Sequence, residues 1–267
     1  MRKKRTTAIG FLLTLVLASA CKKVIDVDLK GTTPQIVIEG NITDAGGPYV
    51  VRITKTVDFS ANNVYPPVTN AVVTITDSTM KHTEQLQQID SGVYVTSTII
   101  GQTHHTYGMA VDIDGQRYTA SSTMPRRVQL DSITFAENVN FNNQQEINAV
   151  VNFQDPATVG NYYMFTEYVN SRQIPDIFVF EDRLSAGRYI EEPLFNDSSY
   201  LQKGDTLVLS MDCIDQNTYN YFFTLLNVTG NNNFQSVTPS NPVTSISNGA
   251  LGYFSAHTSQ RAAISVY

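Results

Sequence analysis

Alternating apolar and polar residues predict a series of short β-strands between residues 34 and 124. In the clearest case, residues 107–113, apolar side chains occupy every second position: Tyr107, Met109, Val111 and Ile113. This period is typical of a strand with one buried face. The run leads into Asp114-Gly115, a pair that favours a two-residue hairpin turn. About seven such strands at short spacing predict a β-sandwich of the immunoglobulin or transthyretin type.

A second β-rich domain is expected over residues 128–267, after the Pro125-Arg126-Arg127 boundary. Alternation recurs at 147–153 and 207–211. Residues 162–169 and 177–180 are apolar on both faces, which is typical of central strands covered on both sides. Two final strands are expected at 249–256 and 262–266.

One helix is predicted near residues 215–228. Its apolar residues fall at i, i+3, i+4 and i+7, namely Tyr219, Phe222, Phe223 and Leu226. Asp215 is a suitable N-cap and Gly230 a suitable C′ residue. We expect this aromatic stripe to pack on the sandwich; a ligand platform is the alternative.

The first 20 residues have the pattern of a secretory signal peptide. Residues 2–5 are all basic, and residues 8–20 are uncharged and largely apolar. The apolar run is shorter than the ~20 residues that a membrane-spanning helix needs. We therefore expect residues 1–20 to be removed on export.

The sequence Leu17-Ala18-Ser19-Ala20-Cys21 resembles a bacterial lipobox. The resemblance implies that Cys21 is acylated and becomes the N-terminus, with residues 21–33 as a tether to the membrane. Ordinary cleavage after Ala20, leaving a free thiol, is the alternative. Lys22 differs from the Asp of the usual inner-membrane retention signal, which favours the outer membrane and leaves its periplasmic or outward face open.

Composition limits the classes of partner. The 267 residues carry a net charge of −6, and loss of the four basic residues at 2–5 would leave 14 basic against 24 acidic residues. An acidic surface argues against nucleic acid and against electrostatic binding to anionic lipid. Apart from Cys21 the chain has one cysteine, Cys213, which we expect to be a buried, inert thiol.

Three segments together resemble one bacterial protein family. They are residues 241–256 near the C-terminus, Ile25-Asp26-Val27-Asp28 with Ile36–Gly40 near the N-terminus, and Met211-Asp212 with Tyr219 and Leu225. The chain is similar over nearly its whole mature length to Bacteroidota lipoproteins grouped as a domain of unknown function, DUF4249. The resemblance implies an accessory role beside a TonB-dependent outer-membrane receptor, and it supplies no catalytic residues.

No motif for catalysis, a metal or a cofactor is evident. His104 and His105 would point to opposite faces of a strand, and no further ligand completes a site. Residues 112–115 resemble the start of a calcium loop but lack the remaining ligands, so we interpret them as a hairpin turn. The doublet Glu191-Glu192 is interpreted as a solvated pair, because neighbours on a strand diverge.

Tyrosines are the candidate ligand contacts, because their rings offer rigid binding area at small entropic cost. The candidates are Tyr162, Tyr163 and Tyr168, with residues 231–248 as a rim. Burial of these rings within a strand covered on both faces is the alternative.

Together these patterns predict a non-catalytic cell-envelope lipoprotein that binds an unidentified ligand or protein and works with a TonB-dependent receptor. Two alternatives stay open. A structural or adhesive surface module would have no concave aromatic pocket. A hydrolase with scattered residues would have a cleft where two or more Asp, Glu, His or Ser side chains converge.

Overall fold

The structure is a computed structural model that describes residues 33–58, 64–139, 145–196, 200–229 and 240–267. Cys21, the signal peptide, nearly all of the tether and Gly230 lie outside these residues. Residues 34–267 form one compact unit. Its described residues contain fifteen strands and a single helix, which confirms the mainly β fold predicted from the sequence.

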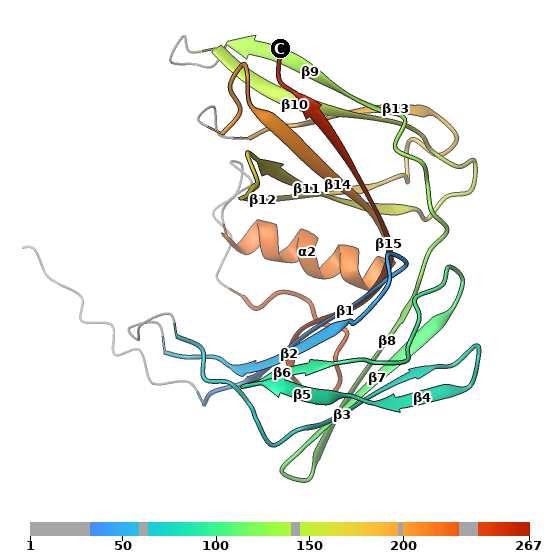
Figure 1. The fold of residues 1–267 in the computed structure, drawn as a ribbon, viewed down its shortest axis with the longest axis vertical. Helices are drawn as coiled ribbons and strands as arrows, with labels where there is room; N and C mark the ends of the chain where they lie inside the picture. The colour runs from blue at the N-terminus through green and yellow to red at the C-terminus, as the bar shows by residue number, and fades with distance from the viewer. Residues whose placement is uncertain (1–32, 59–63, 140–144, 197–199, 230–239) are drawn as a thin grey trace, which may run out of the picture. The chain divides into compact units, whose positions relative to one another are not determined.

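The first half of this unit is a sandwich of two sheets around one hydrophobic cluster (Figure 1). The strands of one layer, in sheet order after β15, are β1 (Ile36–Thr43), β2 (Val50–Lys55), β6 (Val93–Val95) and β5 (Gln87–Asp90). Those of the other layer are β4 (His82–Gln85), β3 (Val72–Asp77), β7 (Thr106–Ile113) and β8 (Gln116–Thr123). Alternation decides which side chains face inward, and along β7 every second residue is buried as predicted.

The β7–β8 hairpin turns at the predicted pair. Asp114 has φ of 50° and Gly115 has φ of 79°, the positive values that a tight two-residue hairpin requires. The Asp114 side chain accepts a hydrogen bond from Asn70 Nδ2 at 2.7 Å, so it fastens the turn to a neighbouring loop. The interpretation of residues 112–115 as a hairpin is confirmed.

The second half repeats the two-layer arrangement around a second hydrophobic cluster. One layer contains β12 (Arg172–Glu181), β11 (Tyr162–Val169) and β14 (Thr206–Ile214), in sheet order before β15. The other contains β13 (Tyr189–Leu194), β10 (Gln145–Gln154) and β9 (Ser132–Val139). β11 is a central strand as predicted, whereas the prediction for residues 177–180 is wrong because β12 is the edge of its sheet.

Strand β15 (Leu251–Ser265) joins the two halves. Its residues 251–257 pair in parallel with β1, and its residues 258–265 pair antiparallel with β14. Phe254 and Ala256 belong to the first hydrophobic cluster, while Ala262 and Ile264 pack against the second. The two strands expected at 249–256 and 262–266 are therefore one continuous strand that runs from one sandwich into the other (Figure 1).

Helix α2 (Gln216–Thr229) follows β14 directly and lies on β15, β12 and β11. Asp215 Oδ1 accepts the Thr218 backbone N–H at 2.8 Å, which confirms Asp215 as the N-cap. Tyr219 and Phe222 are buried, so the helix packs on the sheet as expected, whereas Phe223 of the predicted stripe is 44% exposed and stacks on the ring of Tyr219. The helix also forms one wall of the cleft described next.

Candidate functional site

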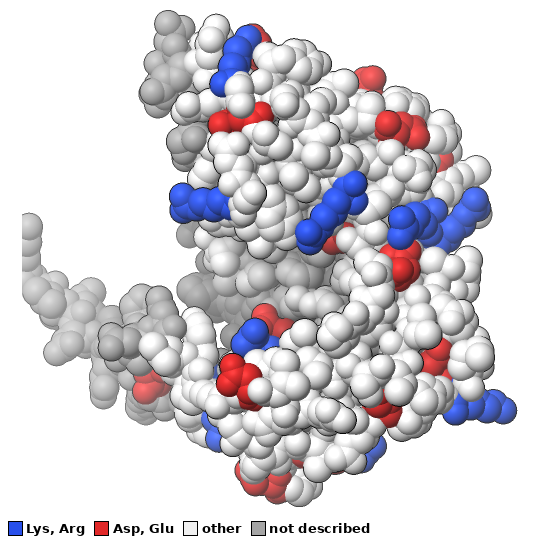
Figure 2. Space-filling view, viewed as in Figure 1, with Lys and Arg blue, Asp and Glu red and all other residues white. Residues whose placement is uncertain are grey.

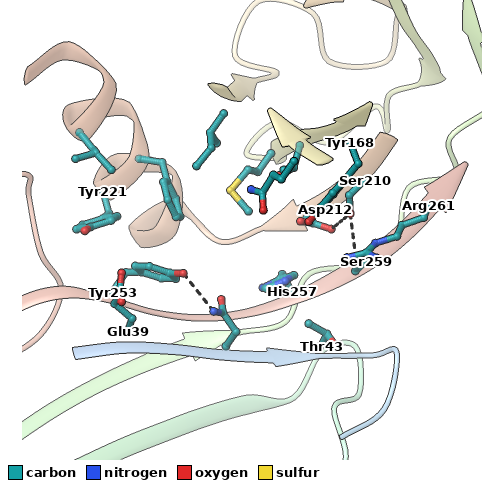
Figure 3. Close-up of a pocket in the computed structure, with 17 residues that line it drawn as sticks. Glu39, Thr43, Tyr168, Ser210, Asp212, Tyr221, Tyr253, His257, Ser259 and Arg261 are labelled. Carbon is teal, nitrogen blue, oxygen red and sulfur yellow. Dashed lines mark hydrogen bonds between the residues drawn. The ribbon is translucent and has the colours of Figure 1, made fainter. Parts of the chain in front are cut away.

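A cleft of about 520 Å³ opens on the face of the large sheet that carries α2 (Figure 3). Its walls come from β1, β11, β12, β14, β15 and α2, all of which meet where β15 changes partners. Along β15 the lining side chains are Tyr253, His257, Ser259 and Arg261, which share one face of the strand. Residues on the opposite face of β15, namely Phe254, Ala256, Ala262 and Ile264, pack in the two hydrophobic clusters. The polar side chains of the strand are therefore left on the face that lines the cleft.

One end of the cleft combines aromatic rings with a carboxylate. Tyr221 and Phe222 of α2 lie 5.1 Å and 4.9 Å from the ring of Tyr253. Asn41 Nδ2 donates a hydrogen bond to the Tyr253 hydroxyl at 3.2 Å. Burial, together with the nearby carboxylate of Glu39, raises the pKa of Tyr221 to about 12. Glu39 is half-buried and directed into the same end (Figure 3).

The floor of the cleft gathers hydroxyl, carboxylate and imidazole groups. Ser210 Oγ donates to Asp212 Oδ1 at 3.0 Å and lies 3.3 Å from Ser259 Oγ. His257 is buried, which lowers its pKa against the opposing effect of Asp212 and other carboxylates. The His257 Nδ1 atom shares a hydrogen bond of 3.0 Å with Ser255 Oγ, so the ring is held on the floor of the cleft.

The opposite end carries a cation. Arg261 is exposed, and its guanidinium lies 5.2 Å from the ring centre of Tyr168, within the range of a cation–π contact. In the register of β14 and β15, Arg261 lies opposite Ser210. Figure 3 shows Arg261 and Tyr168 at the end of the cleft away from Glu39, Tyr221 and Tyr253.

The structure separates the three tyrosines proposed from the sequence. Tyr168 lines the cleft, and Tyr162 packs 5.0 Å from the ring of Tyr219 on α2. Tyr163 points to the other face of β11, where it is fully buried with its ring 4.8 Å from Phe153. Tyr163 is therefore a buried core residue, the alternative to ligand contact that the sequence left open. In the part of the predicted rim that is described, residues 240–248, no side chain lines the cleft.

The other residues considered in the sequence lie away from the cleft. Cys213 is buried, and burial raises the pKa of its thiol, as expected for an unreactive cysteine. His105 contacts Asp77 at 2.7 Å, while His104 is exposed. Glu191 and Glu192 face opposite sides of β13. Glu191 is exposed, but Glu192 is partly buried and burial raises the pKa of its carboxyl, so the interpretation as a solvated pair is wrong for Glu192. Within the described ranges, no group of three or more His, Cys, Asp or Glu could hold a metal ion.

Outside the cleft, a second polar cluster lies under β11. Glu167 is fully buried, and its Oε2 accepts a hydrogen bond from the Asn196 side chain. Its other oxygen, Oε1, has no partner, and neither do Asn148 Nδ2 and Asn196 Oδ1. Burial raises the pKa of Glu167 to about 7, with a further contribution from Asp176. A β-bulge at Glu167 interrupts the pairing of β11 with β12.

Sequence reasoning missed most of the cleft. Glu39 is more than a hundred residues from Asp212 and Arg261 in the chain, and only the pairing of β1, β14 and β15 unites the three. One local signal existed: residues 253–261 carry a polar side chain at every second position. In a strand that pattern indicates a wet face opposite a buried one.

Charged side chains of both signs are spread over the face shown in Figure 2. In the part of the chain that the structure describes, no helix is long and apolar enough to cross a membrane.

These features define a mainly β protein of two joined sandwiches with a cleft between helix and sheet. The model of the family described as "Domain of unknown function (DUF4249)" matches residues 22–262, and the chain belongs to this family. No curated protein matches the chain. Among solved structures, the selenomethionine-substituted chicken interferon gamma receptor alpha chain is 10% identical, with 68% of this chain and 89% of that chain covered at a TM-score of 0.21.

Proposed function

We propose that this protein is a lipid-anchored binding protein of the bacterial outer membrane, which uses the cleft beside α2 to hold a ligand for a TonB-dependent receptor. The observation that carries the binding role is the cleft itself. Its volume of about 520 Å³ falls in the range of small-molecule and short-oligomer sites. Its lining combines aromatic rings with polar groups from several elements, the mixture that such sites use.

The anchoring role is supported by the lipobox-like sequence that ends at Cys21. Acyl chains contribute about 0.8 kcal/mol per buried CH₂ group, and stable anchoring takes more than one chain. The test is Cys21→Ser in the full chain, followed by separation of membranes from soluble envelope proteins. We expect the variant to leave the membrane fraction, and continued sedimentation with membranes at the wild-type level contradicts the anchor.

The accessory role is tested by affinity purification of the tagged full-length protein from detergent-solubilised membranes. We expect a TonB-dependent receptor to co-purify in stoichiometric amount. Recovery of the protein alone, in several detergents, contradicts the association. Proteinase treatment of intact cells then distinguishes the outward face, where the protein is digested, from the periplasmic face, where it is protected.

The convergence of Asp212, His257 and Ser210 favours hydrolysis as a second candidate. The hydrogen bonds of these residues favour binding instead. Ser210 is bonded to Asp212, and His257 is bonded to Ser255, which is buried at 1% exposure beneath the cleft. A nucleophilic serine is activated by a positioned base such as an imidazole and needs access to substrate. Ser210 lines the cleft but bonds to Asp212 and not to His257, and Ser255, which bonds to His257, does not line the cleft. Turnover of ester or glycoside probes that is lost in His257→Gln would favour the hydrolase.

A further inference from the structure

Resting on the proposed binding function of the cleft, we infer that its ligand is a short peptide with charges of both signs, bound in an extended form along β15. The inference starts from the charged side chains of the cleft. Glu39, Asp212 and Arg261 all line it. None of the ion pairs between described residues involves any of these three.

Unpaired charges in a concave site indicate the charges of the ligand. A carboxylate that is partly removed from water is stabilised by a cationic partner, since it otherwise loses solvation without compensation, and an exposed guanidinium binds a carboxylate through its paired N–H groups. Glu39 is half-buried, and Asp212 is 6% exposed. A neutral oligosaccharide supplies no charge to either end, whereas a peptide supplies both signs from its termini or side chains.

The charges are arranged with a direction. Glu39 lies opposite Tyr253 in the pairing of β1 with β15, so the negative end is also the aromatic end. A carboxylate beside Tyr221 and Tyr253 suits an ammonium or guanidinium group, which gains from both the charge and the ring faces. Arg261, at the other end, presents the planar donor pair that carboxylates bind. The amino-terminal or basic part of the peptide therefore lies at Glu39 and its carboxylate at Arg261, while Asp212, which lies opposite Ser259 between these ends, faces a basic or hydrogen-bond-donating group of the peptide.

The length of the cleft fits a chain of several residues. Its ends are marked by Tyr253 and Arg261 on the same strand. With a rise of about 3.3 Å per residue, this separation corresponds to about 26 Å, the span of about eight residues of an extended peptide. The cleft volume of about 520 Å³ encloses part of such a chain, so its outward side chains stay in solvent. Between the ends, Met164, Ile177 and Leu225 offer apolar surface to peptide side chains. Methionine adapts to different partners, which suits a site that accepts more than one sequence.

The test uses the detergent-solubilised full-length protein and a pool of synthetic eight-residue peptides with free termini, with binding measured by equilibrium dialysis and mass spectrometry. Peptides should be retained, and retention should fall as the salt concentration rises. Glu39→Gln and Arg261→Gln should each weaken binding about tenfold or more, equivalent to about 1.4 kcal/mol. Glu191→Gln and Arg117→Gln, which change exposed residues outside the cleft, are the matched controls and should bind as the wild type does.

Two further probes decide between ligand classes. When the ends of the same peptides are acetylated and amidated, the peptides without charged side chains should no longer bind. Malto-oligosaccharides should not compete. Absence of peptide binding, equal binding by the Glu39 and Arg261 variants, or oligosaccharide binding that Tyr253→Ala abolishes would each overturn the inference. If peptides fail to bind and the receptor still co-purifies, the inference alone fails; if peptides bind and no receptor co-purifies, the accessory role alone fails.

Discussion

Arg127 and Asp44 are joined across the point where β15 changes partners: Arg127 Nη2 donates to Asp44 Oδ2 at 2.5 Å. The same nitrogen donates to the Ser259 carbonyl oxygen at 3.2 Å. Asp44 Oδ1 in turn accepts the Ser259 backbone N–H at 2.9 Å. Residues 258–265 pair only with β14 among the strands, so this arrangement satisfies backbone groups that β1 no longer reaches.

Asp44→Ala should therefore destabilise the protein more than the loss of an ordinary surface ion pair. It leaves the Ser259 N–H without an acceptor, and we expect the free energy of unfolding to fall by about 1–3 kcal/mol. Urea unfolding followed by circular dichroism measures the change. The matched control is Asp112→Ala, which breaks a largely exposed pair with Arg117 and should cost less than about 1 kcal/mol. Equal effects of the two variants would show that the junction is not stabilised in this way.

Glu167→Gln should avoid the loss of stability that the wild type suffers when the buried Glu167 carboxyl ionises towards neutral pH. Burial raises the pKa of Glu167 from 4.5 to about 7, so the folded protein holds a proton that the unfolded chain releases. The stability associated with this group is fully present below about pH 4.5 and is lost as pH rises through about 7, by up to about 3 kcal/mol.

Stability of the wild type and of Glu167→Gln, measured in urea from pH 4.5 to 8, checks this sign. The wild type should lose stability relative to the variant as pH rises. Glu191→Gln, at an exposed position on β13, should follow the wild type. A constant difference between wild type and Glu167→Gln across this range would contradict the raised pKa.

Glu84 should give the opposite dependence at acid pH. Burial alone would raise its pKa, but hydrogen bonds from Ser97 and Thr98 outweigh burial and lower the pKa to about 2. The stability from this carboxylate is present above about pH 4.5 and is lost as pH falls towards 2. Glu84→Gln should be less stable than the wild type at pH 7, and the difference should shrink on acidification. A difference that grows between pH 4.5 and 2 would refute the assignment.

Gly252→Ala should disrupt the pairing of β15 with β1. Gly252 has φ of +101°, and a Cβ atom there would lie 2.0 Å from the Ile38 carbonyl oxygen, so both the backbone conformation and the contact exclude a side chain. We expect a loss of more than about 3 kcal/mol or failure to accumulate folded protein. The control is Gly108→Ala on β7, where nothing lies within 4 Å of the added atom and stability should change little. Similar thermal midpoints for the two variants would contradict this requirement.

The sequence predicted the local elements well because their signals lie in neighbouring residues. The alternation at 107–113, the Asp114-Gly115 turn and the Asp215 cap each depend on a few consecutive side chains, and all three are confirmed. The break expected after residue 256 is wrong for a physical reason. Gln260 satisfies the backbone of the passing segment, since its side chain donates to the Val128 carbonyl and accepts from the Leu130 N–H. A polar residue could therefore continue the strand instead of ending it.

The cleft could not be predicted in the same way. It exists because Gly40 pairs with Phe254 and Asp212 pairs with Ser259, and nothing in the neighbouring sequence specifies either register. The tyrosines show the same limit. The sequence does not distinguish Tyr162, Tyr163 and Tyr168, which all belong to one strand. Their different environments depend on the alternation of side chains, on α2 and on the bulge at Glu167.

Strand β15 belongs to both sandwiches, and this has a consequence for the order of folding. Phe254 and Ala256 complete a hydrophobic cluster whose other strands are made at the beginning of the chain. The first sandwich therefore stays open, with apolar side chains uncovered, until residues 251–265 have been synthesised and have travelled back to β1. Such distant pairing slows folding. For the exported protein that we propose, slow closure would be useful, because a polypeptide that has not yet folded can still be threaded through a narrow translocation pore.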